Sequence, residues 1–227
     1  LRTRPRVPGD DGRFQPRQLR GELGLVRDRR GGEQELWLRP IHGREPPQAP
    51  YVPSAAAAAG RADFATIAAW IAPGSHVLDL GCGDGSLLAF LARERNVSGY
   101  GVEITPAGVS ASLANSVNVI QRDLEGGLAG IEDNSFDVVI LSQTLQAMHH
   151  IEEIVDDMLR VGRYAVVSFP NFGHWSPRAQ ILRGRMPVSS SLPYQWYDTP
   201  NIHLCTVADF DAFLAQRRIA VENRVVL

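Results

Sequence analysis

Three glycines and two aspartates lie together in the first half of the chain, with the spacing of a ligand-binding loop. The apolar run at residues 77–80 predicts a buried strand and contains Asp79. Gly81, Gly83 and Gly85 follow at alternate positions, Asp84 lies between the last two, and a helical pattern begins at residue 86. A strand that turns through glycines into a helix brings the backbone close to a ligand at the helix N-terminus.

The carboxylates around this loop distinguish between two classes of ligand. Dinucleotides place a pyrophosphate over a G-x-G-x-x-G loop, whereas this loop reads G-x-G-x-G. Asp79 and Asp84 would repel a pyrophosphate, but they suit S-adenosylmethionine (SAM), which has an ammonium and a sulfonium and no phosphate. Glu103 ends the next predicted strand, 22 residues after Gly81, where a carboxylate can bind both hydroxyls of an adenosine ribose. The pattern therefore favours SAM or S-adenosylhomocysteine over a dinucleotide, and over a tight turn without a ligand.

The sequence contains no complete catalytic set. Methyl transfer needs a base only if the acceptor must lose a proton. His149 and His150 follow the fourth predicted strand and His174 lies further along; each is a weak candidate, since histidines at a helix start are more often capping or solvent-facing residues. Residues 142–146 do not form the Asn/Asp-Pro-Pro-Tyr/Phe motif of amine methyltransferases, and no metal-binding pattern is visible. We therefore assign no catalytic residue from the sequence.

The elements that would position the loop alternate between helix and strand from residue 63 onward. After a first helix with Asp63 at its N-cap, strands are predicted at 75–80, 97–103, 117–121, 136–142, 163–169 and 219–226, and helices at 86–95, 106–115, 151–160 and 207–216. Strands separated by helices predict an α/β fold, a doubly wound and mostly parallel sheet that is covered on both faces. Ligands of such sheets bind at the carboxyl ends of the strands.

Residues 1–60 differ in composition from the rest of the chain. They contain eight prolines, 11 arginines and seven acidic residues, whereas residues 61–227 contain 12 arginines and 18 acidic residues. Such a segment buries too little apolar surface to offset its chain entropy. We therefore predict a disordered Arg/Pro/Gly-rich extension, with a basic arm for an acidic partner as the alternative reading and a short strand-like run at 35–38.

The overall composition is that of a cytoplasmic globular protein. The net charge of −2 argues against a general nucleic-acid binder, and no apolar run is long enough to cross a bilayer. Two cysteines, Cys82 and Cys205, cannot form a disulfide framework or a metal site by themselves. We expect free thiols, and neither a nucleic acid nor a membrane as partner.

Residues 171–204 form an insertion that has little periodicity and many aromatic residues, including Trp175, Tyr194, Trp196 and Tyr197. As a lid, these rings would exclude water from a pocket. As an interface, they would anchor a partner. In a third interpretation they are core residues that hold a long loop in place.

Several motifs together resemble those of class I SAM-dependent methyltransferases and, more narrowly, of the MetW family of methionine-biosynthesis proteins. They are residues 70–74, 77–85, 99–103, 119–124, 136–146, 168–175 and 192–206, of which the last two are the most specific to MetW. The resemblance covers about residues 61–227, so the domain is expected there.

For the site, the resemblance implies that Asp79 orients the loop or accepts from the SAM amine, that the three glycines approach its amino-acid half, and that Glu103 binds the ribose. Ile104 would pack on the adenine face. Asp123 would contact the adenine amine, unless it is a helix cap. The remaining cofactor-binding residues implied are Cys82, Leu124, Ser142 and Gln143.

For function, the resemblance implies a partnership with homoserine O-acyltransferase, in which this chain is a SAM-binding accessory or regulatory subunit. An active methyltransferase on an unknown small molecule is the alternative. A class I sheet closes with a further antiparallel strand, for which the sequence offers no candidate after residues 219–226. We therefore expect a sheet without this strand, in a chain that is a fragment.

Overall fold

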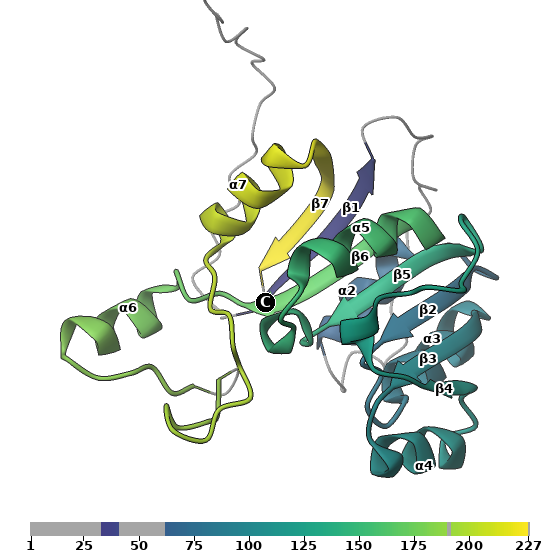
Figure 1. Cartoon of the computed structure of the whole chain (residues 1–227), viewed down its shortest axis with the longest axis horizontal. Helices are drawn as coiled ribbons and strands as arrows, with labels where there is room; N and C mark the ends of the chain where they lie inside the picture. Colours follow the sequence, from purple (N-terminus) through teal and green to yellow (C-terminus); the bar gives the residue numbers. More distant parts are fainter. Residues whose placement is uncertain (1–32, 41–61, 190–191, 227) are drawn as a thin grey trace, which may run out of the picture.

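The computed structural model describes residues 33–40, 62–189 and 192–226. They form one seven-stranded sheet with helices on both faces (Figure 1). The strand order is β4-β3-β2-β5-β6-β1-β7. The predicted α/β sheet is thereby confirmed.

Five neighbouring strands, from β4 at one edge to β6, are parallel and alternate with helices, as the sequence predicts. The strands are β2 (His76–Leu80), β3 (Ser98–Glu103), β4 (Val119–Gln121), β5 (Phe136–Ser142) and β6 (Gly162–Pro170). The helices are α2 (Ala62–Trp70), α3 (Ser86–Arg95), α4 (Pro106–Ala114), α5 (Ile151–Val161), α6 (Trp175–Leu182) and α7 (Val207–Gln216), with short 3-10 turns η1 (Leu124–Gly126) and η2 (Leu145–Ala147). One detail differs: α2 begins at Ala62, so Asp63 lies in its first turn rather than at the N-cap.

The order of the strands creates a switch point between β2 and β5. The chain runs outward from β2 to β3 and β4, and then crosses back to place β5 on the other side of β2. The loops after β2 and β5 therefore leave neighbouring strands in opposite directions. This is the place where open α/β sheets bind their ligands.

The structure departs from the sequence prediction at the N-terminal segment. Strand β1 (Glu33–Pro40) comes from the predicted disordered extension, and it pairs antiparallel with both β6 and β7 (Ile219–Val226). An antiparallel strand is thus present in the sheet, and the N-terminal segment supplies it. Local sequence indicated only the strand-like run at 35–38, because pairing with β6 and β7 is long-range. The other residues of the predicted extension lie outside the described ranges.

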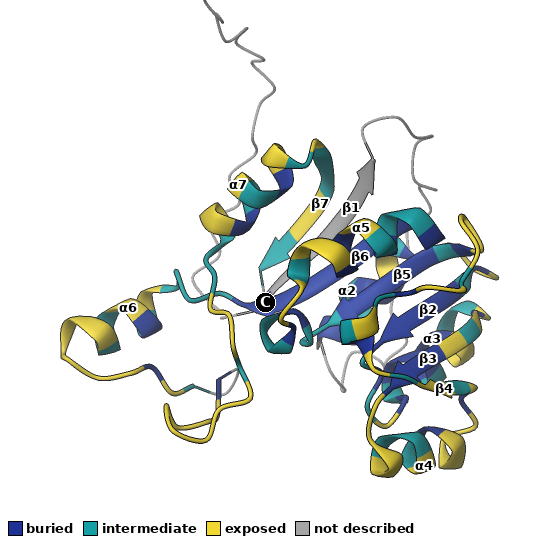
Figure 2. Ribbon diagram, in the orientation of Figure 1, coloured by how far each residue is buried: buried dark blue, intermediate teal, exposed yellow. Residues whose placement is uncertain are grey.

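Two apolar clusters cover the two faces of the sheet, and the strands β2, β5 and β6 between them are mostly buried (Figure 2). On one face α5 and α7 pack through Val155, Met158 and Phe210 against β5 and β6. On the other face α2 and α3 pack through Ile67 and Leu91. Strands that are buried on both faces read as continuous apolar runs, as the sequence of β5 does. Among the described residues, no helix is long and apolar enough to cross a membrane.

Candidate cofactor site

The glycine loop after β2 has a backbone that requires glycine. The φ angles of Gly81, Gly83 and Gly85 are +72°, +57° and +74°, in the left-handed region that other residues rarely adopt. The N–H groups of Gly81 and Cys82 both donate to the carbonyl of Val102, at 2.8 and 3.0 Å. The loop is therefore tied to β3 and leads directly into α3.

The carboxylate of Glu103 joins this loop to the end of β3. Its Oε2 accepts a hydrogen bond from the N–H of Gly83 at 3.1 Å, and its Oε1 accepts from the N–H and the hydroxyl of Thr105 at 2.8 and 2.7 Å. A carboxylate has about four acceptor positions, so three of them are used within the chain. Glu103 is thus held beside the loop by groups on both sides of it.

Asp79 lies beneath the loop and is almost completely buried. Burial raises the pKa of its carboxyl to about 7 from an ordinary value of 3.8, because the charged form loses its hydration. A cation close to this carboxylate would favour the charged form.

The turn after β5 packs closely on the glycine loop. A Cβ atom at Gly81 would lie 2.6 Å from the Oγ1 atom of Thr144, so only glycine fits there. Gln143 has a φ of +55°, which is uncommon for a residue with a side chain. Its N–H and its Nε2 both lie within hydrogen-bonding distance of the Ser168 hydroxyl, which also contacts Ser142 Oγ at 3.0 Å. The predicted residues Ser142 and Gln143 thus lie at the switch point.

The other residues predicted to bind the cofactor take different places. Ile104 is 55% exposed directly after Glu103, where it can cover a ligand. Asp123 caps η1, since its carboxylate accepts from the N–H of Glu125 at 2.9 Å. The side chains of Cys82 and Leu124 are buried, with the Cys82 thiol 3.6 Å from the Ser112 hydroxyl. The thiol of Cys82 therefore packs inside the protein, and burial raises its pKa to about 11.

His149 and His150 share one carboxylate. Glu125 Oε1 accepts from the N–H of His149 at 2.8 Å and lies 3.2 Å from its Nδ1, and Glu125 Oε2 lies 2.9 Å from Nδ1 of His150. Burial alone would raise the pKa of Glu125, but the contacts with the two histidines outweigh it and the net pKa is lowered. The third candidate, His174, lies apart from them at the N-cap of α6.

A cavity of about 550 Å³ lies next to the turn after β5. Its walls are mostly apolar and come from η2, the end of β6 and α7, including Leu145, Phe169 and Phe213. His149, His150 and His203 are among its polar lining residues. The volume is in the range of small-molecule pockets, which span about 300–1,000 Å³.

Sequence reasoning missed three residues that shape this site. Thr105 and Ser168 hold Glu103 and Gln143, and Thr144 contacts the glycine loop. Ser168 had a signal, because it is a polar residue within an apolar strand; the other two had none. Within residues 62–189 and 192–226, no group of three or more His, Cys, Asp or Glu side chains is placed to hold a metal ion.

Comparisons with known proteins agree with this architecture. A curated relative, the bifunctional methionine biosynthesis protein MetXA/MetW of Rhodopirellula baltica, is 38% identical over 165 residues, which is 68% of this chain and 26% of the relative. This chain therefore spans about a quarter of that relative's length. A solved structure of a candidate methyltransferase from Bacillus halodurans C-125 matches with a TM-score of 0.50 and 16% identity, over 68% of this chain and 66% of that one. A SAM-dependent methyltransferase from Archaeoglobus fulgidus matches with a TM-score of 0.49 and 19% identity, over 63% and 60% of the two chains.

The family match is the most extensive of these findings. The family model described as methionine biosynthesis protein MetW matches residues 61–227, which include the glycine loop, Glu103 and the turn after β5. The structural match to the Bacillus protein shows the same fold. The chain belongs to the MetW family of methionine biosynthesis proteins.

Proposed function

We propose that this protein binds SAM or S-adenosylhomocysteine at the glycine loop and acts as an accessory or regulatory partner of homoserine O-acyltransferase. The observation behind the first part is the arrangement of Glu103 against the loop. Glu103 would accept from a ribose hydroxyl at its remaining acceptor position, and Asp79 would stabilise the ammonium of the amino-acid half, directly or through water. Ile104 would lie on the adenine side, whereas Asp123 serves as the cap of η1.

The loop leaves room for such a ligand. A Cβ atom added at Gly83 would meet nothing within 4 Å, whereas one at Gly81 would collide with Thr144. Gly83 therefore faces open space, and Gly81 faces the protein. When bound, SAM would supply an electrophilic methyl group. In the proposed role, SAM acts instead as a signal of methionine supply. This role is preferred because the candidate cofactor site lies beside an incomplete set of catalytic residues.

The second part of the proposal draws on the Rhodopirellula relative, which carries MetXA and MetW in one chain. The family resemblance implies homoserine O-acyltransferase as the partner, and the joining of two methionine-biosynthesis proteins in one chain is consistent with their working together. We propose that the acyltransferase and the MetW domain form such a working complex here as well.

An active methyltransferase is the second candidate, and the cavity lined by Leu145 and Gln146 is the observation in its favour. Two of its three histidines, His149 and His150, are engaged by Glu125. We prefer the accessory role because the chain belongs to the MetW family and the Rhodopirellula relative carries MetXA and MetW in one chain. Transfer of a labelled methyl group from SAM to any component of a metabolite extract would reverse this preference.

The cofactor site is tested by calorimetric titration of SAM into the wild-type chain and two variants. Gly83→Arg places a long side chain in the open space of the loop and should abolish binding. Gly74→Arg is the matched control, because Gly74 has a similar φ of +78° and also has nothing within 4 Å of its Cβ position, but it lies before β2. Wild-type protein that does not bind SAM would refute the cofactor assignment.

The partnership is tested by the rate of homoserine acylation. The purified acyltransferase from the source organism is assayed alone, with the wild-type chain, and with the wild-type chain plus SAM. We expect the chain to raise the rate and SAM to change that effect. Equal rates in all three assays would refute the accessory role.

A further inference from the structure

The insertion at residues 171–204 forms a lobe that extends away from the sheet, with α6 at its outer part (Figure 1). We call it the aromatic lobe; its residues 190–191 lie outside the described ranges. Of the 14 large hydrophobic side chains that are exposed in the described residues, ten lie between Trp175 and Leu204. Leu182 is 88% exposed, and Trp196, Tyr197 and Trp175 are 71%, 70% and 68% exposed. Most of the exposed apolar surface is therefore concentrated in one small part of the protein.

Hydrogen bonds fix the lobe to the body at its base. The N–H groups of Ile202 and His203 both donate to the carbonyl of Gln146, at 2.7 and 3.0 Å, and the N–H of Phe172 donates to the carbonyl of Cys205 at 3.1 Å. Within the lobe, the amide of Gln180 pairs with both backbone groups of Val188. The lobe therefore has its own internal structure and still leaves its rings exposed.

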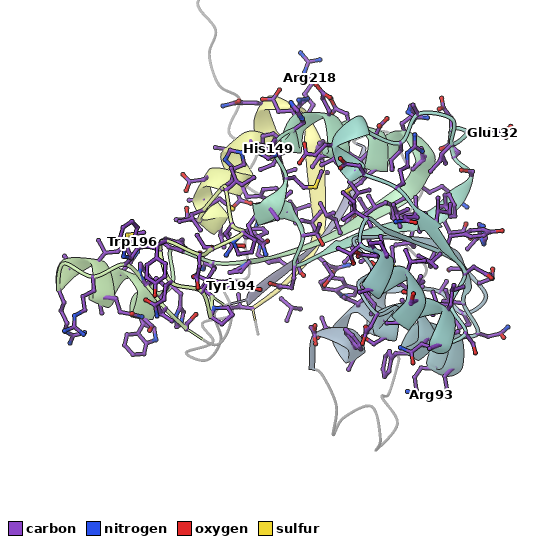
Figure 3. All side chains as sticks on the ribbon, turned by 60° about the horizontal axis from the view of Figure 1, so that its bottom comes forward. Arg93, Glu132, His149, Tyr194, Trp196 and Arg218 are labelled. Carbon is purple, nitrogen blue, oxygen red and sulfur yellow. The ribbon has the colours of Figure 1, made fainter. Side chains whose placement is uncertain are left out.

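The exposed rings do not form a core of their own, which argues against the core interpretation. Trp196 lies beside α6, whereas Tyr194 lies nearer the body (Figure 3). The rings of Trp196 and Tyr197 contact each other edge to face, 5.7 Å apart, and present their remaining surface to solvent. Large apolar patches of this kind on a protein surface mark interaction sites, and Trp and Tyr are frequent anchors in them.

The charge of the lobe is opposite to that of the rest of the domain. The lobe contains Arg178, Arg183 and Arg185 and a single acidic residue, Asp198, whereas the other residues of 61–227 contain nine arginines and 17 acidic residues. The three arginines are all exposed. A matching partner would have an apolar recess surrounded by acidic side chains.

A protein partner explains this surface better than a membrane does. Helices that lie on membranes present a continuous apolar face along their length. Here the exposed apolar side chains come from the eight-residue α6 and from the irregular segment after it. The fused relative, in addition, joins MetW to another protein.

We infer that the aromatic lobe is the surface on which the acyltransferase docks, with Trp175, Leu182, Trp196 and Tyr197 as apolar anchors and Arg178, Arg183 and Arg185 as a basic rim. This inference rests on the proposed function and adds to it the part of the chain that makes the contact. The base of the lobe meets Gln146, three residues after Gln143 of the cofactor site. The docking surface and the cofactor site are thus attached to the same turn after β5.

The test measures the affinity of the full chain for the purified acyltransferase. Leu182→Ser, Trp196→Ser and Arg183→Glu should each weaken binding at least tenfold, while SAM binding and the melting temperature stay at wild-type values. Leu113→Ser is the matched control, since Leu113 is 61% exposed on α4, and it should bind as wild type does. Leu182 and Arg183 are exposed, so these two variants keep the test valid if Trp196→Ser does not fold.

The outcomes separate this inference from the proposed function. Wild-type affinity in all three lobe variants would overturn the docking surface and leave the partnership intact. A wild-type chain that neither binds the acyltransferase nor changes its rate would refute the partnership, and the docking surface with it. Vesicles of anionic phospholipid are the second probe: binding that Trp196→Ser abolishes, together with unchanged affinity for the acyltransferase, would overturn the inference in favour of a membrane surface.

Discussion

The carboxylate of Glu103 accepts a hydrogen bond from the backbone N–H of Gly83, 3.1 Å away, so a side chain at the end of β3 holds the glycine loop after β2. The same carboxylate holds Thr105 at the start of α4. Glu103 therefore has two roles in the proposed site. It shapes the loop, and it would offer its remaining acceptor capacity to the ribose of the ligand.

Replacement of Glu103 by Gln should weaken SAM binding about ten- to a hundredfold, since hydrogen bonds to a charged group contribute about 1.5–3 kcal/mol. The NH₂ group of the glutamine would also place a donor where Glu103 has an oxygen that accepts from a backbone N–H group. Calorimetric titration measures the affinity. Glu132→Gln is the control, because Glu132 lies exposed in the turn before β5, away from the loop (Figure 3). Equal affinities for the two variants would contradict the role of Glu103.

Gly81→Ala should destabilise the protein more than Gly74→Ala does. Both residues have positive φ, at +72° and +78°, so both variants incur a backbone cost of about 1–2 kcal/mol. Only the methyl group at position 81 would collide with Thr144, which adds about 1–3 kcal/mol. Urea unfolding measures the difference.

A second substitution checks the cause of this difference. Thr144→Ala removes the Oγ1 and Cγ2 atoms that the new methyl group would meet, so it should restore part of the stability of Gly81→Ala. The double-mutant cycle isolates this contact. Equal losses for Gly81→Ala and Gly74→Ala, or no recovery with Thr144→Ala, would show that the two loops are not closely packed in solution.

Helices and strands with a regular apolar pattern could be predicted from the sequence, whereas elements that depend on contacts with distant residues could not. Helices α3 and α7 and strands β5 and β7 have the bounds that apolar periodicity predicts. Helix α6 was missed, because most of its eight residues are exposed or half-buried and give no apolar stripe. Strand β1 pairs with residues more than a hundred positions away, which local patterns do not encode.

The candidate cofactor site likewise has parts that the sequence predicts and parts that it does not. Asp79, the glycine loop and Glu103 come together as predicted, because parallel strands bring their carboxyl ends to one edge of the sheet. The burial of Cys82 and Leu124 was not predicted, because the sequence does not tell which side of a turn faces the core. The engagement of His149 and His150 by Glu125 joins residues about 24 positions apart, and nothing in their spacing indicated it.

Glu125→Gln should make the protein less sensitive to acid. The contacts with His149 and His150 lower the pKa of Glu125 in the folded state, so they stabilise the fold above the pKa of the unfolded chain. This stabilisation is lost as the pH falls through the folded pKa. Because Glu125 and the two histidines are partly exposed, we expect their contacts to contribute less than about 1 kcal/mol to the free energy of unfolding.

The measurement compares the melting temperatures of wild type and Glu125→Gln between pH 6 and about pH 3, where glutamates titrate. The difference between the two proteins should shrink toward the acid end. Glu132→Gln, which removes an exposed glutamate, should show no such trend. A constant difference would mean that the histidine contacts do not form in solution.

Asp79 should make the protein less stable as the pH rises from about 4 to 7. Burial raises its folded pKa to about 7, while the unfolded chain loses this proton near 3.8. Between these values the folded state binds more protons than the unfolded state, so the free energy of unfolding falls with rising pH. The difference between the two pKa values corresponds to about 4 kcal/mol.

Urea unfolding at pH 4.5 and pH 7.5 measures this effect. Asp79→Asn has no proton to lose, so its stability should fall less than that of wild type between the two pH values. Asp198→Asn, in the aromatic lobe, removes an exposed carboxylate and should behave as wild type does. Parallel pH profiles for wild type and Asp79→Asn would show that the Asp79 carboxyl is already charged in the folded protein.

The same carboxyl should make SAM binding depend on pH. The ammonium of SAM favours the charged form of Asp79, so the ligand must displace a proton when it binds below the pKa of about 7. The affinity should therefore rise from pH 5.5 to pH 7.5. Titrations in buffers with different ionisation enthalpies should show proton release at pH 6, and this release should disappear in Asp79→Asn. If proton release persisted in Asp79→Asn, the proton would come from another group. Asp79 would then shape the loop without contacting the ligand.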